Sequence, residues 1–294
     1  MPIRPVALIS LILMLLTAPM ASAAGAEFVG RFVWNTGSEH HGGYSGFELD
    51  ATGTGFVALS DRGWIATGTL TRKDGIIDGA SLLSFNRLRD PKGNSVPTSR
   101  EDAEGLTMRR DGRLYVSFEG YARVWTYASA ASKAAWIPRH PDFAGMQGNS
   151  SLEALAIAPD GSLYTLPERS GERSRPFPVY RWNGRVWSQP FTLPRRGDYL
   201  PVGADFGPDG RFYLLERRFS GIIGFSSRVR RFDIVGNRIG NEQLLLTTGN
   251  LRHDNLEGLA VWRNSTGDIR LTMISDDNFS IFQTTEIVEY RVTE

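Results

Sequence analysis

Residues 152–170 read LEALAIAPDGSLYTLPERS, and this stretch recurs along the chain with variations. It consists of two strand patterns joined by an Asp-Gly corner, which predicts a β-hairpin. Counterparts occupy residues 44–63, 103–121, 202–219 and 256–279. A small residue near the start of each copy is separated from the next by 59, 49, 49 and 55 positions; these residues are Gly46, Gly105, Ala154, Gly203 and Gly258. Repeats of this length are typical of the four-stranded blades of a β-propeller.

Further strand patterns follow the repeated hairpins and predict the outer half of each blade. Residues 123–127, 177–182 and 227–234 each begin such an outer pair, whereas the fifth copy is followed by a single pattern at residues 285–293. The pattern FVGRFVW, residues 28–34, can supply the missing strand, which would close the ring and remove exposed edges. We therefore expect an all-β fold, a single propeller of five four-stranded blades closed by an N-terminal strand. Six blades are the alternative, with a degenerate blade in residues 64–102.

The N-terminal segment has the pattern of a cleaved secretory signal. It combines a basic start at Arg4, an apolar run over residues 6–16 and the small-residue site Ala21-Ser22-Ala23. We assign residues 1–23 to a signal peptide and residues 24–294 to one domain, which predicts a periplasmic or secreted protein. No later window has the roughly 18 consecutive apolar residues of a membrane span.

Composition excludes several classes of function. The 294 residues include 33 basic and 32 acidic ones, and the signal removes one arginine, so the mature charges balance. A neutral chain has no global attraction to nucleic acid or to an anionic membrane. The absence of cysteine excludes disulfides and thiol chemistry. The sequence also contains no Gly-x-Ser-x-Gly elbow, no HExxH motif, no phosphate-binding glycine loop and no dinucleotide fingerprint.

Acidic residues recur at two places in the repeated hairpin. The first strand pattern begins with an acid in three copies, at Glu104, Glu153 and Glu257, whereas Ser45 and Val202 take this place in the other two. The second pattern ends with an acid in four copies, at Asp61, Glu119, Glu168 and Asp276. If the turns have two residues, the counting places Glu104 opposite Glu119, Glu153 opposite Glu168 and Glu257 opposite Asp276. In the first copy the corresponding pair is Ser45 and Asp61, around a turn near Gly53. In the fourth copy the counting places Glu216 opposite Gly203.

Facing carboxylates repel one another unless a divalent cation, an inserted arginine or a shared proton offsets their charge. The first strands of the blades converge on one mouth of the central channel, so we expect these acids to meet there. The expected metal ligands are Asp61, Glu104, Glu119, Glu153, Glu168, Glu257 and Asp276. Oxygen-only ligands suit Ca²⁺ or Mg²⁺, and a high coordination number favours Ca²⁺. The alternative is that the carboxylates bond backbone amides and arginines and lock neighbouring blades together.

Histidines and arginines near the same mouth are candidates for catalysis. His40, His41, His140 and His253 all precede first strands, and His253 lies beside Asp254 and close to Glu257 in sequence. We therefore take His253 as the candidate general acid or base. Arg62 and Arg169 directly follow the acids that end second strands and are candidates for contacting an anionic group of the substrate.

Four segments of the chain resemble the esterase-like, phytase-like domain of bacterial secreted proteins. They are residues 44–63, 101–119, 149–168 and 253–262, and the resemblance covers nearly the whole chain from about Gly30. Its specific parts are the SGF…ALSDRG opening and the D-x-EGL…DG element. The resemblance implies a secreted β-propeller that hydrolyses phosphoesters or esters. By similarity to Ca²⁺-dependent propeller phytases, acids at the channel mouth would hold metal ions, which with basic residues would position a phosphate and activate water.

The sequence therefore predicts a periplasmic, metal-dependent hydrolase of phosphoester or ester bonds, with Ca²⁺ as cofactor. We expect a monomer that acts on a small anionic substrate. Two alternatives stay open: a non-catalytic propeller that binds a ligand or a protein with its acidic mouth, and a metal-dependent lactonase-like hydrolase of neutral cyclic esters.

Overall fold

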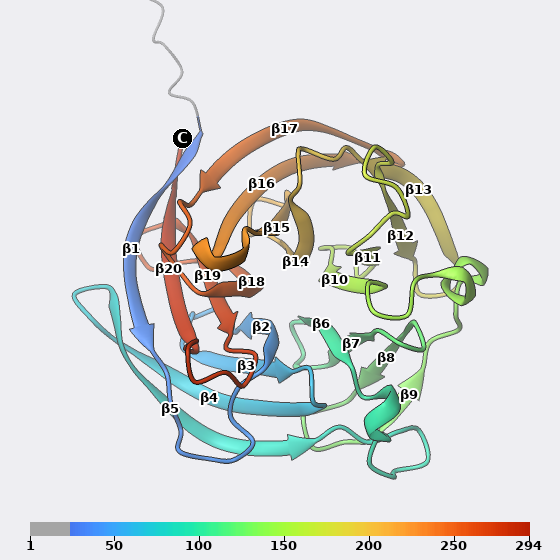
Figure 1. Cartoon of the computed structure of the whole chain (residues 1–294), viewed down its shortest axis with the longest axis horizontal. Coiled ribbons are helices and arrows are strands. Elements are labelled where there is room, and N and C mark those ends of the chain that lie inside the picture. Colours follow the sequence, from blue (N-terminus) through green and yellow to red (C-terminus); the bar gives the residue numbers. More distant parts are fainter. Residues whose placement is uncertain (1–23) are drawn as a thin grey trace, which may run out of the picture.

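A computed structural model describes residues 24–294, which form five four-stranded sheets arranged around a central axis (Figure 1). The prediction of a five-bladed propeller is confirmed. The six-blade alternative is wrong, because residues 64–102 contain β4 (Trp64–Lys73) and β5 (Ile76–Arg87), which complete the first blade. The expected signal peptide lies outside the described residues. Within those residues, no helix has the length and apolar character needed to cross a membrane.

Four blades each consist of four strands that follow one another in the chain. The first contains β2 (Tyr44–Leu49), β3 (Gly55–Ser60), β4 and β5, and the second contains β6 (Ala103–Met108), β7 (Leu114–Phe118), β8 (Arg123–Tyr127) and β9 (Ala134–Trp136). The third contains β10 (Leu152–Ile157), β11 (Leu163–Pro167), β12 (Phe177–Trp182) and β13 (Trp187–Leu193). The fourth contains β14 (Leu200–Phe206), β15 (Phe212–Phe219), β16 (Phe225–Val235) and β17 (Arg238–Thr247). Short 3₁₀ turns occur in the loops as η1 (Thr98–Arg100), η2 (Pro141–Gly145) and η3 (Gly221–Ile223).

The fifth blade joins the two ends of the described chain. It consists of β18 (Asn255–Arg263), β19 (Ile269–Asp276), β20 (Glu286–Thr293) and β1 (Gly25–Val33). β1 pairs antiparallel with β20 and forms the outer edge of the blade (Figure 1). The predicted closure by an N-terminal strand is therefore confirmed, and it hydrogen-bonds the start of the fold to its end.

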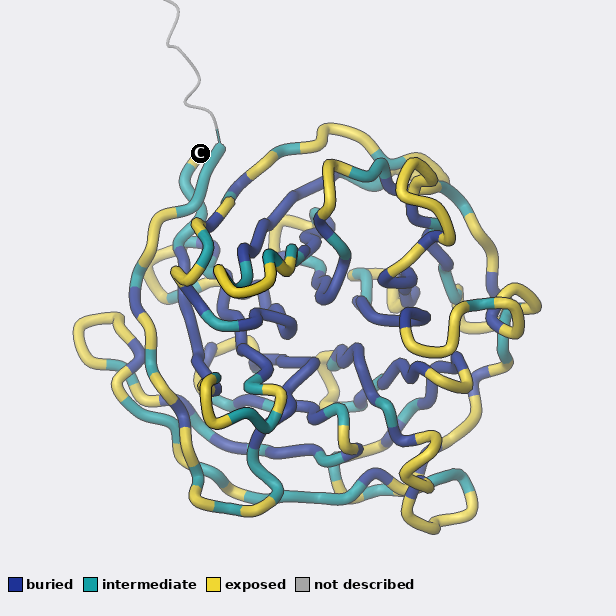
Figure 2. The backbone as a smooth tube through the Cα atoms, viewed as in Figure 1, coloured by how far each residue is buried: buried dark blue, intermediate teal, exposed yellow. Residues whose placement is uncertain are grey.

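The core lies between neighbouring blades, where apolar side chains pack face to face. One cluster joins Phe47 of the first blade to Trp262 of the fifth, and four comparable clusters fill the other interfaces of the described fold. The innermost strands around the axis are buried, whereas the exposed residues concentrate in loops and outer strands (Figure 2). Gly203 allows the fifth blade to approach closely, since a Cβ atom there would lie 2.3 Å from the carbonyl oxygen of Glu257.

The register of the inner hairpins differs from the prediction of two-residue turns. The turns of blades two to five are three-residue loops that end in a glycine with positive φ, such as Gly112 (φ 85°) and Gly161 (φ 83°). In addition, each first strand has a β-bulge near its start, for example between Leu152 and Ala154. The expected oppositions are therefore wrong: Asn255 is opposite Asp276, and Pro201 is opposite Glu216.

Candidate functional site

The five bulges place one residue of each blade at an equivalent inner position. The register shifts lie between Tyr44 and Gly46, Ala103 and Leu106, Leu152 and Ala154, Pro201 and Gly203, and Leu256 and Gly258. They leave Ser45, Glu104, Glu153, Val202 and Glu257 without a direct partner on the second strand. A bulge redirects the side chain of its extra residue. The three glutamates are nevertheless almost fully buried, with 9%, 6% and 6% of their surface exposed in chain order.

A second set of equivalent positions follows from the same register. In each blade, the residue paired with the last position before the bulge is followed by a charged residue; the five are Asp61, Glu119, Glu168, Arg217 and Asp276. Four of them are acids, and the fourth blade has an arginine instead. We call the acids of both sets, seven in total, the acid ring. The fourth blade is the exception at both positions, because it contributes Val202 and Arg217.

Burial and mutual repulsion raise the pKa of six carboxyls of the acid ring, those of Asp61, Glu104, Glu119, Glu153, Glu257 and Asp276. Burial is the largest cause throughout, and it raises the pKa of Glu119 to about 7, of Asp276 to about 8 and of Asp61 to about 6. The pKa values of Glu104 and Glu153 lie well above the ordinary range, with repulsion from other members of the ring as the next cause. The carboxyls therefore influence one another although they belong to different blades.

Arg217 neutralises one side of the acid ring. Its Nη1 atom lies 2.5 Å from Oε1 of Glu257 and donates to Oδ1 of Asn255 at 2.9 Å. Its Nη2 atom lies 3.4 Å from Oε1 of Glu168. Burial lowers the pKa of Arg217, but the surrounding carboxylates outweigh this effect and raise it above its ordinary value. The inserted arginine considered at the sequence level is therefore present, and it comes from the blade that lacks the acids.

The other side of the acid ring has no such counter-charge. Oxygen atoms of Asp102, Glu104 and Glu119 lie within 4.8 Å of one another, and no lysine or arginine in the described residues forms an ion pair with them. Glu119 accepts a hydrogen bond from the backbone amide of Ser151 at 2.7 Å. We call Asp102, Glu104 and Glu119 the open acid cluster.

The open acid cluster fits a divalent cation by its donor chemistry. It offers carboxylate oxygens only, which is the ligand type that Ca²⁺ and Mg²⁺ prefer. Glu104 is 9% exposed, and no hydrogen bond or ion pair to its carboxyl group is present among the described residues, so a bound cation would be its first partner. Asp102 was missed at the sequence level. The spacing Asp102-x-Glu104, which recurs as Asn255-x-Glu257, is the signal that could have identified it.

The candidate catalytic residues lie in different environments. Arg169 borders the acid ring, with Nε 3.4 Å from Oε2 of Glu168. Arg62 is exposed and stacks on Phe279, with its guanidinium carbon 3.3 Å from the ring centroid. His253 is buried beside β20 and its Nε2 atom lies 2.6 Å from the Tyr290 hydroxyl. Nδ1 of His253 lies 3.6 Å from Oε2 of Glu286, and no hydrogen bond or ion pair among the described residues joins this histidine to the acid ring.

Comparisons with known proteins place the chain among propeller families. A family model described as phytase-like, with esterase-like activity of phytase, matches residues 39–279. No curated protein matches the sequence. An α-L-arabinofuranosidase structure from Podospora anserina has 14% identity and a TM-score of 0.50, covering 92% of this chain and 98% of that one. A gluconolactonase structure from Xanthomonas campestris has 16% identity and a TM-score of 0.44, covering 84% of this chain and 72% of that one. At these identities the structural matches show the fold alone.

Proposed function

Because the chain belongs to the phytase-like family, we propose that it is a metal-dependent hydrolase of phosphoester or ester substrates that acts at the channel mouth. The typical secretory signal in residues 1–23 supports a periplasmic or secreted location. The observation that carries the proposal is the open acid cluster, where three carboxylates converge without a basic partner. Such a cluster is costly to maintain unless a cation or protons offset its charge.

Asp102, Glu104 and Glu119 are the residues that would hold the metal ion, with Ca²⁺ favoured over Mg²⁺ because carboxylate-rich, irregular sites suit it. A bound ion there would polarise an ester or phosphoryl oxygen and lower the pKa of a bound water. Glu104 lies close enough for its charge to raise the pKa of Glu153, so an ion at the open acid cluster would also reduce the repulsion between neighbouring blades. Of the seven acids predicted as ligands, Glu168 and Glu257 are already engaged by Arg217.

The non-catalytic alternative rests on a specific observation in the same ring. Arg217 and Asn255 satisfy Glu257 within the protein, so part of the acid ring stabilises contacts between blades. The two functions therefore make opposite predictions for the open acid cluster. A hydrolase needs metal at Glu104 and Glu119, whereas a structural ring keeps them protonated without an ion.

Metal analysis of matched variants tests the proposal. The mature protein is purified without chelator, and its metal content is measured by inductively coupled plasma mass spectrometry. We expect Glu119→Gln to lose the bound metal, whereas Glu168→Gln, at the equivalent position one blade on but paired with Arg217, retains it. Hydrolysis of p-nitrophenyl phosphate, p-nitrophenyl acetate and a lactone is then compared with and without EDTA. Equal metal content in folded wild type and Glu119→Gln would overturn the assignment.

A further inference from the structure

Four arginines gather around a cavity of about 700 Å³ between the third and fourth blades. They are Arg169, Arg173, Arg195 and Arg218, and we call the cavity the arginine pocket. Two acids, Glu172 and Asp198, also line it, so the lining charges sum to four minus two, or +2. Glu172 pairs with Arg175 outside this set of lining residues, with 3.3 Å between their closest charged atoms. The pocket therefore has an excess of positive charge.

Most of the positive charge in the arginine pocket has no acidic partner. Among the described residues, Arg173, Arg195 and Arg218 form no ion pair, and the Nε atoms of Arg195 and Arg218 are buried without a hydrogen-bond acceptor. Aromatic rings support these two half-buried arginines instead: the guanidinium carbon of Arg195 lies 4.5 Å from the ring centroid of Phe177, and that of Arg218 lies 5.2 Å from the centroid of Tyr199. Stacking holds a guanidinium by its face and leaves donors at its edge for an anion.

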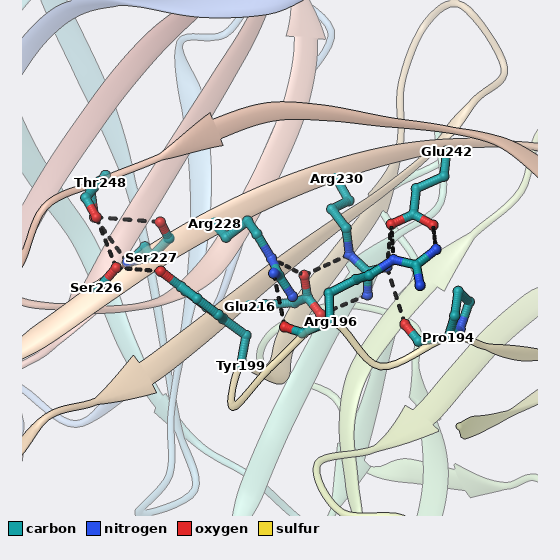
Figure 3. A network of polar contacts seen from close by, with 10 residues as sticks. All are labelled: Pro194, Arg196, Tyr199, Glu216, Ser226, Ser227, Arg228, Arg230, Glu242 and Thr248. Carbon is teal, nitrogen blue, oxygen red and sulfur yellow. Dashed lines mark hydrogen bonds and ion pairs between the residues drawn. The ribbon is translucent and has the colours of Figure 1, made fainter. Parts of the chain in front are cut away.

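Neighbouring arginines of the fourth blade show the contrast, since each has its acid (Figure 3). The fully buried Glu216 accepts from Arg228 at 2.8 Å and from Arg230 at 2.7 Å. Glu242 pairs with Arg196 at 2.6 Å and with Arg230 at 2.9 Å. Acids are thus present in this blade and are used to neutralise other arginines. The lack of partners in the arginine pocket is not a general property of this arginine-rich region.

The same network fixes the backbone on both sides of Arg195 (Figure 3). Arg230 donates to the carbonyl oxygen of Pro194 at 3.2 Å, and Arg228 donates to the carbonyl oxygen of Arg196 at 2.9 Å. Tyr199, which supports Arg218, is held by a 2.6 Å hydrogen bond between its hydroxyl group and that of Ser226. Two arginines of the pocket are therefore positioned before any ligand arrives, which reduces the entropy cost of binding.

We propose that the arginine pocket binds an oxyanion, a phosphate or a carboxylate group, that belongs to the substrate but is not the group being cleaved. Guanidinium groups bind both kinds of anion with paired, charge-assisted hydrogen bonds. Arg169 connects the pocket with the acid ring through Glu168, so an anion in the pocket lies beside the channel mouth. The assignment of this anion to a substrate rests on the proposed function, whereas the affinity of the pocket for an oxyanion does not.

Calorimetric titration of the mature protein in EDTA tests the pocket separately from the metal. Inorganic phosphate and citrate are used as probes, and their comparison distinguishes a preference for phosphate from one for carboxylates. We expect Arg173→Gln and Arg195→Gln each to weaken binding about tenfold, as the loss of one charge-assisted hydrogen bond predicts. Arg185→Gln, which removes an exposed charge in a turn of the same region of the chain, is the control and keeps wild-type affinity.

Each outcome bears on one of the two proposals. Phosphate or citrate binding that persists in EDTA and in Glu104→Gln, but weakens in the arginine variants, supports the pocket even if no hydrolysis is found. Binding that requires calcium and is unaffected by Arg173→Gln and Arg195→Gln places the anion on the metal, which overturns the pocket and leaves the proposed function standing. The absence of binding by either probe at millimolar concentrations also overturns the pocket.

Discussion

Replacing Arg217 by glutamine removes the positive charge that lies between Glu257 and Glu168. The substitution keeps hydrogen-bonding capacity but leaves the buried Glu257 without a counter-charge and Glu168 with Arg169 alone. Removing one partner of a buried ion pair costs about 3–5 kcal/mol. The side chain of Arg217 is 24% exposed whereas that of Glu257 is 7% exposed, so solvent compensates part of the loss and we expect the lower end, about 3 kcal/mol.

The assay is thermal unfolding of Arg217→Gln and wild type in EDTA, followed by the same comparison with calcium. A loss of 1 kcal/mol lowers the melting temperature of a domain somewhat smaller than this one by about 2–4 °C, and the shift decreases with size, so we expect a decrease of about 6 °C. Calcium should restore much of the melting temperature that Arg217→Gln loses. Without Arg217, the side chains of Asn255, Glu257 and Asp276 are freed, and they occupy the same repeat positions as the open acid cluster. A ligand at a hundred times its dissociation constant stabilises by about 2.7 kcal/mol.

Two controls separate the charge from the bulk of the side chain. Arg217→Lys keeps the charge and should melt between wild type and Arg217→Gln, whereas Arg185→Gln removes an exposed arginine and should melt with wild type. If Arg217→Gln melts at the wild-type temperature in EDTA, Arg217 is not the counter-charge of the ring, and the reasoning on the acid ring fails.

Three further predictions concern other parts of the fold. Glu216→Gln leaves the buried Arg228 without its acid and Arg230 with Glu242 alone, and should lower the free energy of unfolding by about 3–5 kcal/mol in urea titrations; an unchanged midpoint would contradict a neutralising role. In EDTA, the melting temperature should fall as the pH rises from about 5 to 8, because the pKa values of Glu119 (about 7) and Asp276 (about 8) are raised by burial and the folded state keeps protons that the unfolded state releases; a rising melting temperature would refute this. Gly203→Ala forces a Cβ atom against the Glu257 carbonyl and should cost about 1–3 kcal/mol, whereas Gly240→Ala, with open space around it, should be nearly neutral.

The sequence predicts the architecture well because blade length and strand patterns are local features that repeat. Five copies at regular spacing allow a ring, and the spare strand β1 has one unpaired edge available to it, on β20. The register of the hairpins was predicted wrongly because an Asp-Gly corner is compatible with loops of two or three residues. The third loop residue and the bulge shift the pairing by one or two positions, and neither leaves a distinct pattern in the sequence.

The candidate site shows the same division between repeated and unrepeated features. The acids were found because they recur in equivalent positions, and the wrong register did not matter, since the bulges and strand ends still bring them to one mouth. Arg217 was given no specific role, because two-residue turns made Glu216 appear to be the fourth acid. Counting 49 positions from Glu168 instead reaches Arg217, so the signal was present. The position of His253 depends on packing against Tyr290, which no repeat encodes.

The fourth blade breaks the symmetry of the acid ring, and this changes the distribution of charge on both sides of the channel mouth. Its valine and arginine remove two potential ligands from the mouth, and Arg217 neutralises the adjacent acids of the third and fifth blades. The open acid cluster is therefore confined to the second blade.

The same fourth blade provides Arg195 and Arg218, held by the Glu216 network, to the arginine pocket. Negative charge thus remains on one side of the mouth and positive charge on the other. A fully symmetric acidic ring would bind cations in five equivalent orientations, whereas the proposed sites would distinguish the two ends of a substrate. The proposed metal and anion sites consequently require a substrate in which the cleaved bond and a second charged group are separate.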